Sequence, residues 1–312
     1  MKQLSGLTEE QRLKRLNPPQ GKISMVLDTD TFNEIDDQFA IVYTLLAKER
    51  IDLKAIYAAP FHNSLSDGAK DGMEKSYEEI QHILHRMNVS DHNFVFKGSE
   101  SFMLKENEPI DSAAARDLIA KAKEASPEAP LYVVAIGAIT NVASAILLAP
   151  EIINHIVVVW LGGHALHWPQ TKEFNLVQDV WSARTVLDCG APLVLIPCAG
   201  VASHLITSLP EINEYVKDKG AIGQFLAERY ESCANDHFAY SRVIWDISAI
   251  AWLLQPEAVP TDIVHSPVLT DQVTWSVDHS RHLIRVANFV NRDMVFKDLF
   301  GRLDAAYREG KL

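Results

Sequence analysis

Cysteine is scarce in this chain: Cys189, Cys198 and Cys233 are the whole set among 312 residues. An odd number of widely spaced cysteines without a CxxC pair predicts neither a disulfide framework nor a zinc site. The simplest interpretation is reduced cysteines in the core of a protein that stays in a reducing compartment. We therefore expect a cytoplasmic location.

Long apolar runs and dense basic runs are also missing. No apolar run approaches the length of about 20 residues that a helix needs to span a bilayer, and residues 1–21 lack the apolar core of a signal peptide. Acidic residues outnumber basic ones by 41 to 29, for a net charge of −12. This balance argues against nucleic acid or a membrane surface as a partner and suits an enzyme with cationic or neutral small ligands.

Apolar strand-like runs alternate with amphipathic helical patterns. The strand-like runs are continuously apolar, which predicts burial on both faces and hence a mostly parallel central sheet flanked by helices, an open Rossmann-like α/β fold. We expect a polar N-terminal extension over residues 1–20, which ends at Pro18-Pro19, and a single α/β domain over 21–312. The predicted strands are 23–28, 52–58, 93–96, 131–136, 156–161 and 192–196, with shorter ones in 263–287. The predicted helices are 36–48, 67–87, 111–124, 140–148, 179–188, 211–231, 235–255 and 290–308.

Five acids are crowded where the first predicted strand meets the first helix after it: Asp28, Asp30, Glu34, Asp36 and Asp37. No Lys or Arg lies between Lys22 and Lys48 to balance them. Helix capping accounts for an acid or two in the first turn of the helix. A hard divalent cation, which takes six to eight oxygen ligands in the case of Ca²⁺, accounts for the whole cluster. Both interpretations stay open at this point.

The strand followed by Asp28-Thr29-Asp30 also fits the nucleophile motif of aspartyl-phosphate phosphotransferases. That chemistry usually needs a lysine and a second acidic pair late in the chain, and no convincing pair follows a late strand. The pair Asp36-Asp37 is also surplus to it. We therefore disfavour phosphoryl transfer.

Four segments resemble, in order, the motifs of the nucleoside hydrolase family, the inosine–uridine-preferring hydrolases, and the resemblance extends from about residue 23 to 308. The family's Asp-x-Asp-Pro-Gly-x-Asp-Asp is similar to the acid cluster, and its late His-Asp is similar to Trp245-Asp246. Its Gly-Pro-Leu-Thr-Asn and its Met-Gly-Gly with Glu-Phe-Asn have counterparts here. These are Gly137-Ala138-Ile139-Thr140-Asn141, then Leu161-Gly162-Gly163 with Glu173-Phe174-Asn175.

The resemblance implies a Ca²⁺-dependent N-ribohydrolase that converts a ribonucleoside and water to ribose and a free base. Asp30 would be the general base and a calcium ligand, beside Asp37, the Thr140 carbonyl and Asp246. The ribose hydroxyls would be held by Asp36, Asn63, Glu173 and Asn175. The family forms homodimers and homotetramers, so we expect a homo-oligomer.

Two departures from the family pattern affect the side that would hold the base. Residues 31–35 are five where the family usually has three, and Trp245 replaces a histidine. Other candidates for this side are His164, in a loop, and His237 and Tyr240, which share a face if 235–246 is helical. Two alternatives therefore remain: hydrolysis of a non-standard N-riboside, and a protein that binds metal and ribose with little turnover.

Overall fold

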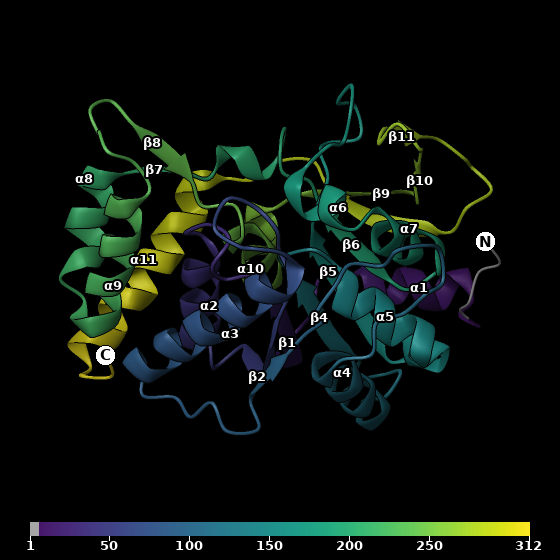
Figure 1. Ribbon diagram of the computed structural model, residues 1–312, viewed down its shortest axis with the longest axis horizontal. Helices are drawn as coiled ribbons and strands as arrows, with labels where there is room; N and C mark the ends of the chain where they lie inside the picture. Colours follow the sequence, from purple (N-terminus) through teal and green to yellow (C-terminus); the bar gives the residue numbers. More distant parts are fainter. Residues whose placement is uncertain (1–5) are drawn as a thin grey trace.

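The computed structural model describes residues 6–312, which are built around a sheet of eight strands in the order β3-β2-β1-β4-β5-β6-β12-β9 (Figure 1). All neighbours pair in parallel except β9, which is antiparallel to β12. The predicted α/β class with a mostly parallel sheet is confirmed. The strands are β1 Ile23–Thr29, β2 Ile51–Ala58, β3 Val95–Lys97, β4 Leu131–Ala135, β5 Ile156–Leu161, β6 Leu193–Ile196, β9 Thr261–His265 and β12 Leu283–Ala287.

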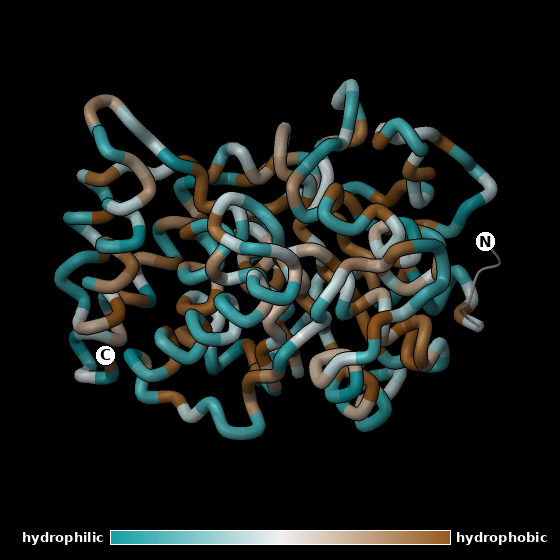
Figure 2. The backbone as a smooth tube through the Cα atoms, viewed as in Figure 1, coloured by the Kyte–Doolittle hydropathy of each residue, from teal (hydrophilic) through white to brown (hydrophobic). Residues whose placement is uncertain are grey.

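Helices cover both faces of the sheet, and each face has its own apolar core. In β1, Met25 and Leu27 point into one core and Val26 into the other, which is why the strand is apolar at consecutive positions. Figure 2 shows hydrophilic residues along the outer loops and helix surfaces. The first core is covered by α2 Asp37–Leu46, α3 Ala69–Arg86, α9 Gly220–Ser232, α10 Ile247–Leu254 and α11 Arg292–Arg308, and the second by α4 Ala113–Glu124, α5 Thr140–Leu148 and α7 Val180–Asp188.

The predicted helix over 235–255 is wrong in its first half. Residues 241–243 form strand β8 (Ser241–Val243), which pairs antiparallel with β7 (Ile206–Ser208). Ala239, just before it, has a φ of +52°, which a right-handed helix does not allow. Pairing with β7 provides hydrogen-bond partners for backbone groups that would otherwise have bonded within the helix. His237 and Tyr240 therefore do not share a helical face.

The predicted helix over 211–231 is interrupted. It is divided into α8 (Leu209–Ile212), a π-helical turn (Asn213–Lys217) and α9. Gly220, at the start of α9, has a φ of +74°, a conformation that glycine adopts without steric cost. The chain therefore changes direction here, and α9 packs against α3 beside the candidate site described below.

The N-terminal helix α1 (Glu9–Leu16) starts at a capping box formed by Thr8 and Gln11. Leu16 is fully buried, and the helix contacts β12. Residues 1–5 of the predicted extension lie outside the described residues. Placing a boundary at residue 20 stays a prediction.

The carboxyl ends of the central strands meet at one edge of the sheet. Asp28 of β1 is in register with Tyr57 of β2 and Ala135 of β4, and Leu161 of β5 with Ile196 of β6. In open α/β sheets, ligands bind beyond this edge. Within residues 6–312, no helix is long and apolar enough to cross a membrane.

Candidate active site

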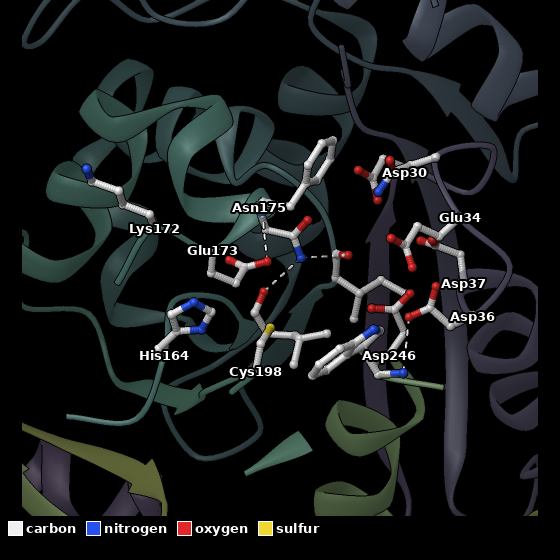
Figure 3. Close-up of a pocket in the computed structure, with 15 residues that line it drawn as sticks. Asp30, Glu34, Asp36, Asp37, His164, Lys172, Glu173, Asn175, Cys198 and Asp246 are labelled. Carbon is white, nitrogen blue, oxygen red and sulfur yellow. Dashed lines mark hydrogen bonds between the residues drawn. The ribbon is translucent and has the colours of Figure 1, made fainter. Parts of the chain in front are cut away.

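A cavity opens beyond the carboxyl ends of β1, β4, β5 and β6, and most of the predicted site residues line it (Figure 3). Acids from the segment after β1 face Glu173 and Asn175, which follow β5, and Asp246 comes from the start of α10. The lining residues are Asp30, Asn33, Glu34, Asp36, Asp37, Ile136, Leu161, His164, Lys172, Glu173, Phe174, Asn175, Cys198, Trp245 and Asp246.

Asp36, Asp37 and Asp246 bring one carboxylate oxygen each within 4.8 Å of one another, and all three are buried. Burial raises the pKa of Asp37 to about 7, and burial with the repulsion of the neighbouring acids raises the pKa of Asp36 and Asp246. Three buried carboxylates at this distance are stable when they share protons or a cation.

Helix capping does not explain these acids. Asp36 and Asp246 occupy the N-cap positions of α2 and α10, yet neither side chain accepts a capping hydrogen bond from the described backbone. Asp36 instead accepts from the backbone amide of Trp245 at 3.1 Å. This bond ties the start of α2 to the start of α10, and it leaves carboxylate oxygens free to face the cavity.

Asp30 completes the acidic wall. Neither of its carboxylate oxygens has a hydrogen-bond partner among residues 6–312, although the side chain is buried. Gly137 makes room for it, because a Cβ there would lie 3.0 Å from the Asp30 carboxylate. Such unsatisfied buried oxygens fit a hard cation. The predicted carboxylate ligands are Asp30, Asp37 and Asp246, whereas the buried trio consists of Asp36, Asp37 and Asp246. Asp30 lines the same cavity.

Thr140, whose carbonyl was the fourth predicted ligand, is the first residue of α5 and does not line the cavity. Its hydroxyl donates to Asp179 at 2.7 Å. Asp179 caps α7 by accepting from the Ser182 amide. Behind the acids, Asn141 donates to Asp28 at 2.8 Å, and burial raises the pKa of Asp28 to about 7. The side chains of Thr140, Asp179, Asn141 and Asp28 thus support the wall of the site, and the role of the Thr140 carbonyl as a ligand stays a prediction.

The opposite wall is fixed by Glu173. Its carboxylate accepts from the backbone amides of Gly163, Asn175 and Leu176, at 2.8 to 3.0 Å. Gly163 has a φ of +67°, and a Cβ there would lie 2.6 Å from Thr171 Oγ1, so the position requires glycine. The Glu173 carboxylate therefore holds the turn after β5 against α6 (Phe174–Gln178).

Asn175 lies in α6, a short helix that starts directly after Glu173. The Asn175 amide nitrogen donates to the carbonyls of Ile136 and Leu161, each at 3.1 Å. These bonds bridge the ends of β4 and β5 and fix the orientation of the amide. Its oxygen is left as an acceptor for a ligand in the cavity.

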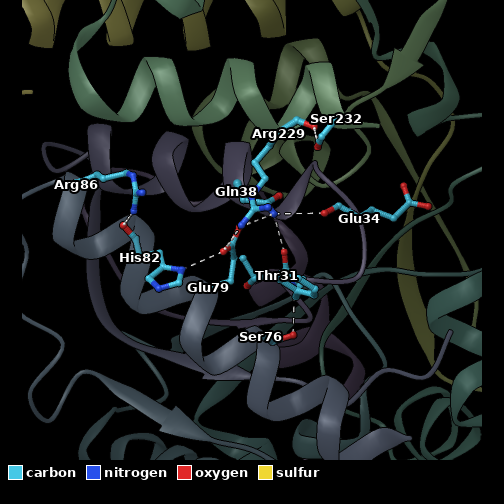
Figure 4. A network of polar contacts seen from close by, with 10 residues as sticks. Thr31, Glu34, Gln38, Ser76, Glu79, His82, Arg86, Arg229 and Ser232 are labelled. Carbon is cyan, nitrogen blue, oxygen red and sulfur yellow. Dashed lines mark hydrogen bonds and ion pairs between the residues drawn. The ribbon is translucent and has the colours of Figure 1, made fainter. Parts of the chain in front are cut away.

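The longer loop over residues 31–35 is held from several sides (Figure 4). Gln38 donates to the Thr31 carbonyl at 2.8 Å and to the buried carboxylate of Glu79 at 3.3 Å. Arg229 of α9 pairs with Glu79 at 2.7 Å. On the cavity side, Arg242 pairs with Glu34 at 2.8 Å. The loop is thus anchored to α3, α9 and β8, and Glu34 adds an acid to the rim.

Asn63 does not line the cavity. Its amide donates to Asn33 Oδ1 at 2.6 Å, so it contacts the site through the loop over 31–35. His237 and Tyr240 are also outside: His237 Nε2 is 2.9 Å from the Glu231 carbonyl, and its ring packs on Tyr230 and Tyr240.

His164 and Trp245 do line the cavity. His164 Nδ1 accepts from the Ala199 amide at 3.3 Å, and burial lowers the pKa of the ring. Sequence reasoning missed Cys198, whose thiol donates to Glu173 and whose pKa is raised by burial, and the lining residues Lys172 and Phe174. Cys198 comes two residues after the end of β6 at Ile196. This position at the carboxyl edge of the sheet could have identified it as a candidate site residue.

Comparison with known proteins gives a consistent result. A sequence profile of the inosine-uridine preferring nucleoside hydrolases matches residues 25–297. The chain is 25% identical over 286 residues to the non-specific ribonucleoside hydrolase RihC of Klebsiella pneumoniae, covering 82% of this chain and 86% of that protein. It is 26% identical over 248 residues to the pyrimidine-specific ribonucleoside hydrolase RihA of Citrobacter koseri, covering 72% and 78%.

The fold has a close counterpart among solved structures. The purine-preferring ribonucleoside hydrolase from Gardnerella vaginalis superposes with a TM-score of 0.73 over 92% of this chain and 99% of that one, at 21% identity. At this identity the similarity concerns the fold. The names of these three relatives specify different bases: one is non-specific, one pyrimidine-specific and one purine-preferring.

Proposed function

Because the chain belongs to the inosine-uridine preferring nucleoside hydrolase family, we propose that it is a Ca²⁺-dependent N-ribohydrolase that cleaves ribonucleosides to ribose and a free base. Membership of this family also argues against the phosphotransferase interpretation. The observation that carries the proposal is the buried Asp36, Asp37 and Asp246 group beside the unsatisfied carboxylate of Asp30, all facing one cavity.

In this proposal Asp37, Asp246 and Asp30 would hold the calcium ion, with Asp36 beside them and the Thr140 carbonyl completing the protein ligands. Oxygen ligands of this kind are those that Ca²⁺ prefers. When bound, the ion would lower the pKa of a water molecule and orient the ribose hydroxyls.

The remaining steps belong to the chain's own residues. Asp30 takes a proton from the attacking water, as its free carboxylate oxygens allow. Asp36 and the Asn175 amide oxygen accept hydrogen bonds from ribose hydroxyls, and Glu173 fixes that wall. Cleavage of an N-glycosidic bond passes through an oxocarbenium-like sugar. The surrounding carboxylates stabilise this positive charge, which develops only in the transition state.

The direct test is an assay of reducing-sugar release over a panel of purine and pyrimidine ribonucleosides, with and without added Ca²⁺. We expect calcium-dependent release. Binding of ribose and calcium without release would favour the alternative of a binding protein with little turnover. We further expect a homodimer or homotetramer in the cytoplasm, as predicted from the sequence.

Calcium-free protein should lose thermal stability as pH rises from 5 to 8, and calcium should restore more stability at pH 8 than at pH 5. The pKa of buried Asp28 is raised from 3.8 to about 7. Between these values the folded protein keeps a proton that the unfolded chain has released, so rising pH favours unfolding. For this one carboxyl, the free energy of unfolding falls by about 2.5 kcal/mol between pH 5 and pH 8.

Thermal unfolding of chelator-treated protein at the two pH values, with and without CaCl₂, measures both effects. The increase in Tm on adding calcium should be larger at pH 8, because the ion binds ionised carboxylates. The same increase at both pH values would contradict the assignment of the acid group to the ion. Added KCl at the same ionic strength is the control for general screening.

p-Nitrophenyl riboside should be cleaved at least as fast as inosine or uridine. A departing base needs a proton or a hydrogen bond, whereas p-nitrophenolate leaves without either. Trp245, where the family has histidine, donates a hydrogen bond but delivers no proton at neutral pH. We therefore expect Trp245→His to raise kcat for inosine or uridine by about tenfold or more, since general acid catalysis is typically worth about 10²–10⁴-fold.

The aryl riboside is the control substrate for this variant, because its kcat should stay nearly constant. Much faster hydrolysis of inosine or uridine than of the aryl riboside by the unmodified protein would mean that an acid is already present. Trp245→Phe, which adds no acid, should not reproduce the gain.

A further inference from the structure

None of the three basic side chains that the structure describes around the cavity, His164, Lys172 and Arg242, is placed to protonate a leaving base. The Nδ1 atom of His164 accepts a backbone hydrogen bond and burial lowers the pKa of the ring, so at neutral pH its Nε2–H donates a hydrogen bond but does not act as a cationic acid. Lys172 is directed away from the acid group in Figure 3. Arg242, paired with Glu34, does not release protons. Without a proton from these three groups, and with the carboxyl groups bound to a cation, a neutral purine or pyrimidine would leave this site as an anion.

The same cavity is strongly acidic. Its described lining includes six carboxyl groups, against one lysine, Lys172, and the histidine His164, with Arg242 behind the rim. A divalent cation offsets two of the six. Trp245 and Phe174 add two aromatic side chains to the lining, and the face of an aromatic ring attracts cations. An anionic leaving group is repelled here, and a cationic one is attracted.

We propose, on the basis of the N-ribohydrolase function proposed above, that the preferred substrates are ribosides whose aglycone carries a positive charge shared with the glycosidic nitrogen, such as pyridinium ribosides. The bond between C1′ and this nitrogen breaks, and its electron pair neutralises the aglycone. The water oxygen bonds to C1′, and Asp30 takes the proton. The aglycone departs as a neutral molecule, so no general acid is needed.

Charge also moves in a favourable direction during this reaction. The positive charge passes from the aglycone to the ribose ring, which the buried carboxylates surround. The substrate and the transition state are thus both cationic. The carboxylates lie closer to the positive charge in the transition state, so they stabilise the transition state more strongly than the substrate. The neutral aglycone then has no charge to hold it in the acidic cavity.

The test compares kcat/KM for three substrates: nicotinamide riboside as the pyridinium riboside, p-nitrophenyl riboside as a neutral aryl riboside that needs no acid, and inosine. We expect the pyridinium riboside to exceed the aryl riboside by at least about tenfold and inosine by about 10²-fold or more, the range that a missing general acid accounts for. Cleavage of the aryl riboside at an equal or higher rate overturns the proposal and leaves the N-ribohydrolase function standing. Failure of all three substrates overturns that function as well.

Two matched variants test the electrostatic basis of the preference. Glu34→Gln and Arg242→Gln break the same ion pair, but the first removes a negative charge from the rim and the second a positive one. We expect KM for the pyridinium riboside to rise about threefold to tenfold in Glu34→Gln and to fall in Arg242→Gln. KM for the neutral aryl riboside should change little in either variant. Shifts of the same sign in both variants would mean that the ion pair acts only by holding the loop, and would overturn the electrostatic basis.

Discussion

Replacing Asp37 with alanine is expected to give a folded protein that retains no calcium and hydrolyses ribonucleosides at least about 10³-fold more slowly. Asp37 belongs to the buried acid trio, and Thr29 holds its carboxylate in place with a hydrogen bond of 2.5 Å. Removing one ligand from a cation site lowers both affinity and the activation of water. Elemental analysis of the dialysed protein and the reducing-sugar assay measure the two losses.

Asp37→Asn is the companion variant, because it keeps the shape of the side chain and an acceptor for Thr29. Asp71→Ala is the control, since Asp71 lies on the surface in an ion pair with Lys75. The control should keep both calcium and activity. If Asp37→Asn retains stoichiometric calcium and full turnover, the ion is held by other groups and the proposed site is wrong.

2′-Deoxyadenosine is expected to be hydrolysed about 10³–10⁴-fold less efficiently than adenosine, as kcat/KM. The acceptors assigned to the ribose, Asp36 and the Asn175 amide oxygen, are nearly inaccessible to solvent. A substrate that lacks a hydroxyl leaves such acceptors unpaired, and sites built to bind a hydroxyl reject its absence strongly. Steady-state kinetics on the two nucleosides measures the ratio.

Asn175→Ala provides the internal comparison for this prediction. If its amide oxygen accepts a hydrogen bond from the 2′-hydroxyl, the variant should lose more activity on adenosine than on 2′-deoxyadenosine. The ratio of kcat/KM for the two nucleosides should then be smaller than in the unmodified protein. A ratio within tenfold in the unmodified protein would show that the site does not depend on the 2′-hydroxyl.

The fold could be predicted well because its signals are local. Strands such as β4 and β5 are apolar at consecutive positions, and the segments between them repeat at helical spacing. The ends of the predicted strands indicated the edge of the sheet where ligands bind. Asp30, Glu173 and Asn175, which follow strand ends, line one cavity at this edge. The prediction was wrong over 235–246, where pairing of β8 with β7 and the positive φ of Ala239 override the helical pattern.

The parts of the site that sequence reasoning missed depend on distant contacts. Asn63 was predicted to hold a ribose hydroxyl, but its amide donates to Asn33 in the longer loop and it does not line the cavity. Cys198 was expected in the core, and it is buried, yet it also reaches the cavity beside Glu173. The anchoring of the loop by Glu79 and Arg229 joins helices far apart in the chain. No spacing pattern contains such information.

The hydrogen bond between Asp36 and the Trp245 amide joins positions 209 residues apart. During synthesis on a ribosome, the acids after β1 emerge long before Asp246, so the trio assembles only when most of the chain has been made. Until then Asp36 and Asp37 lack their distant partner, Asp246. The ability to hold a cation is thus acquired late, when the start of α10 has packed against the start of α2.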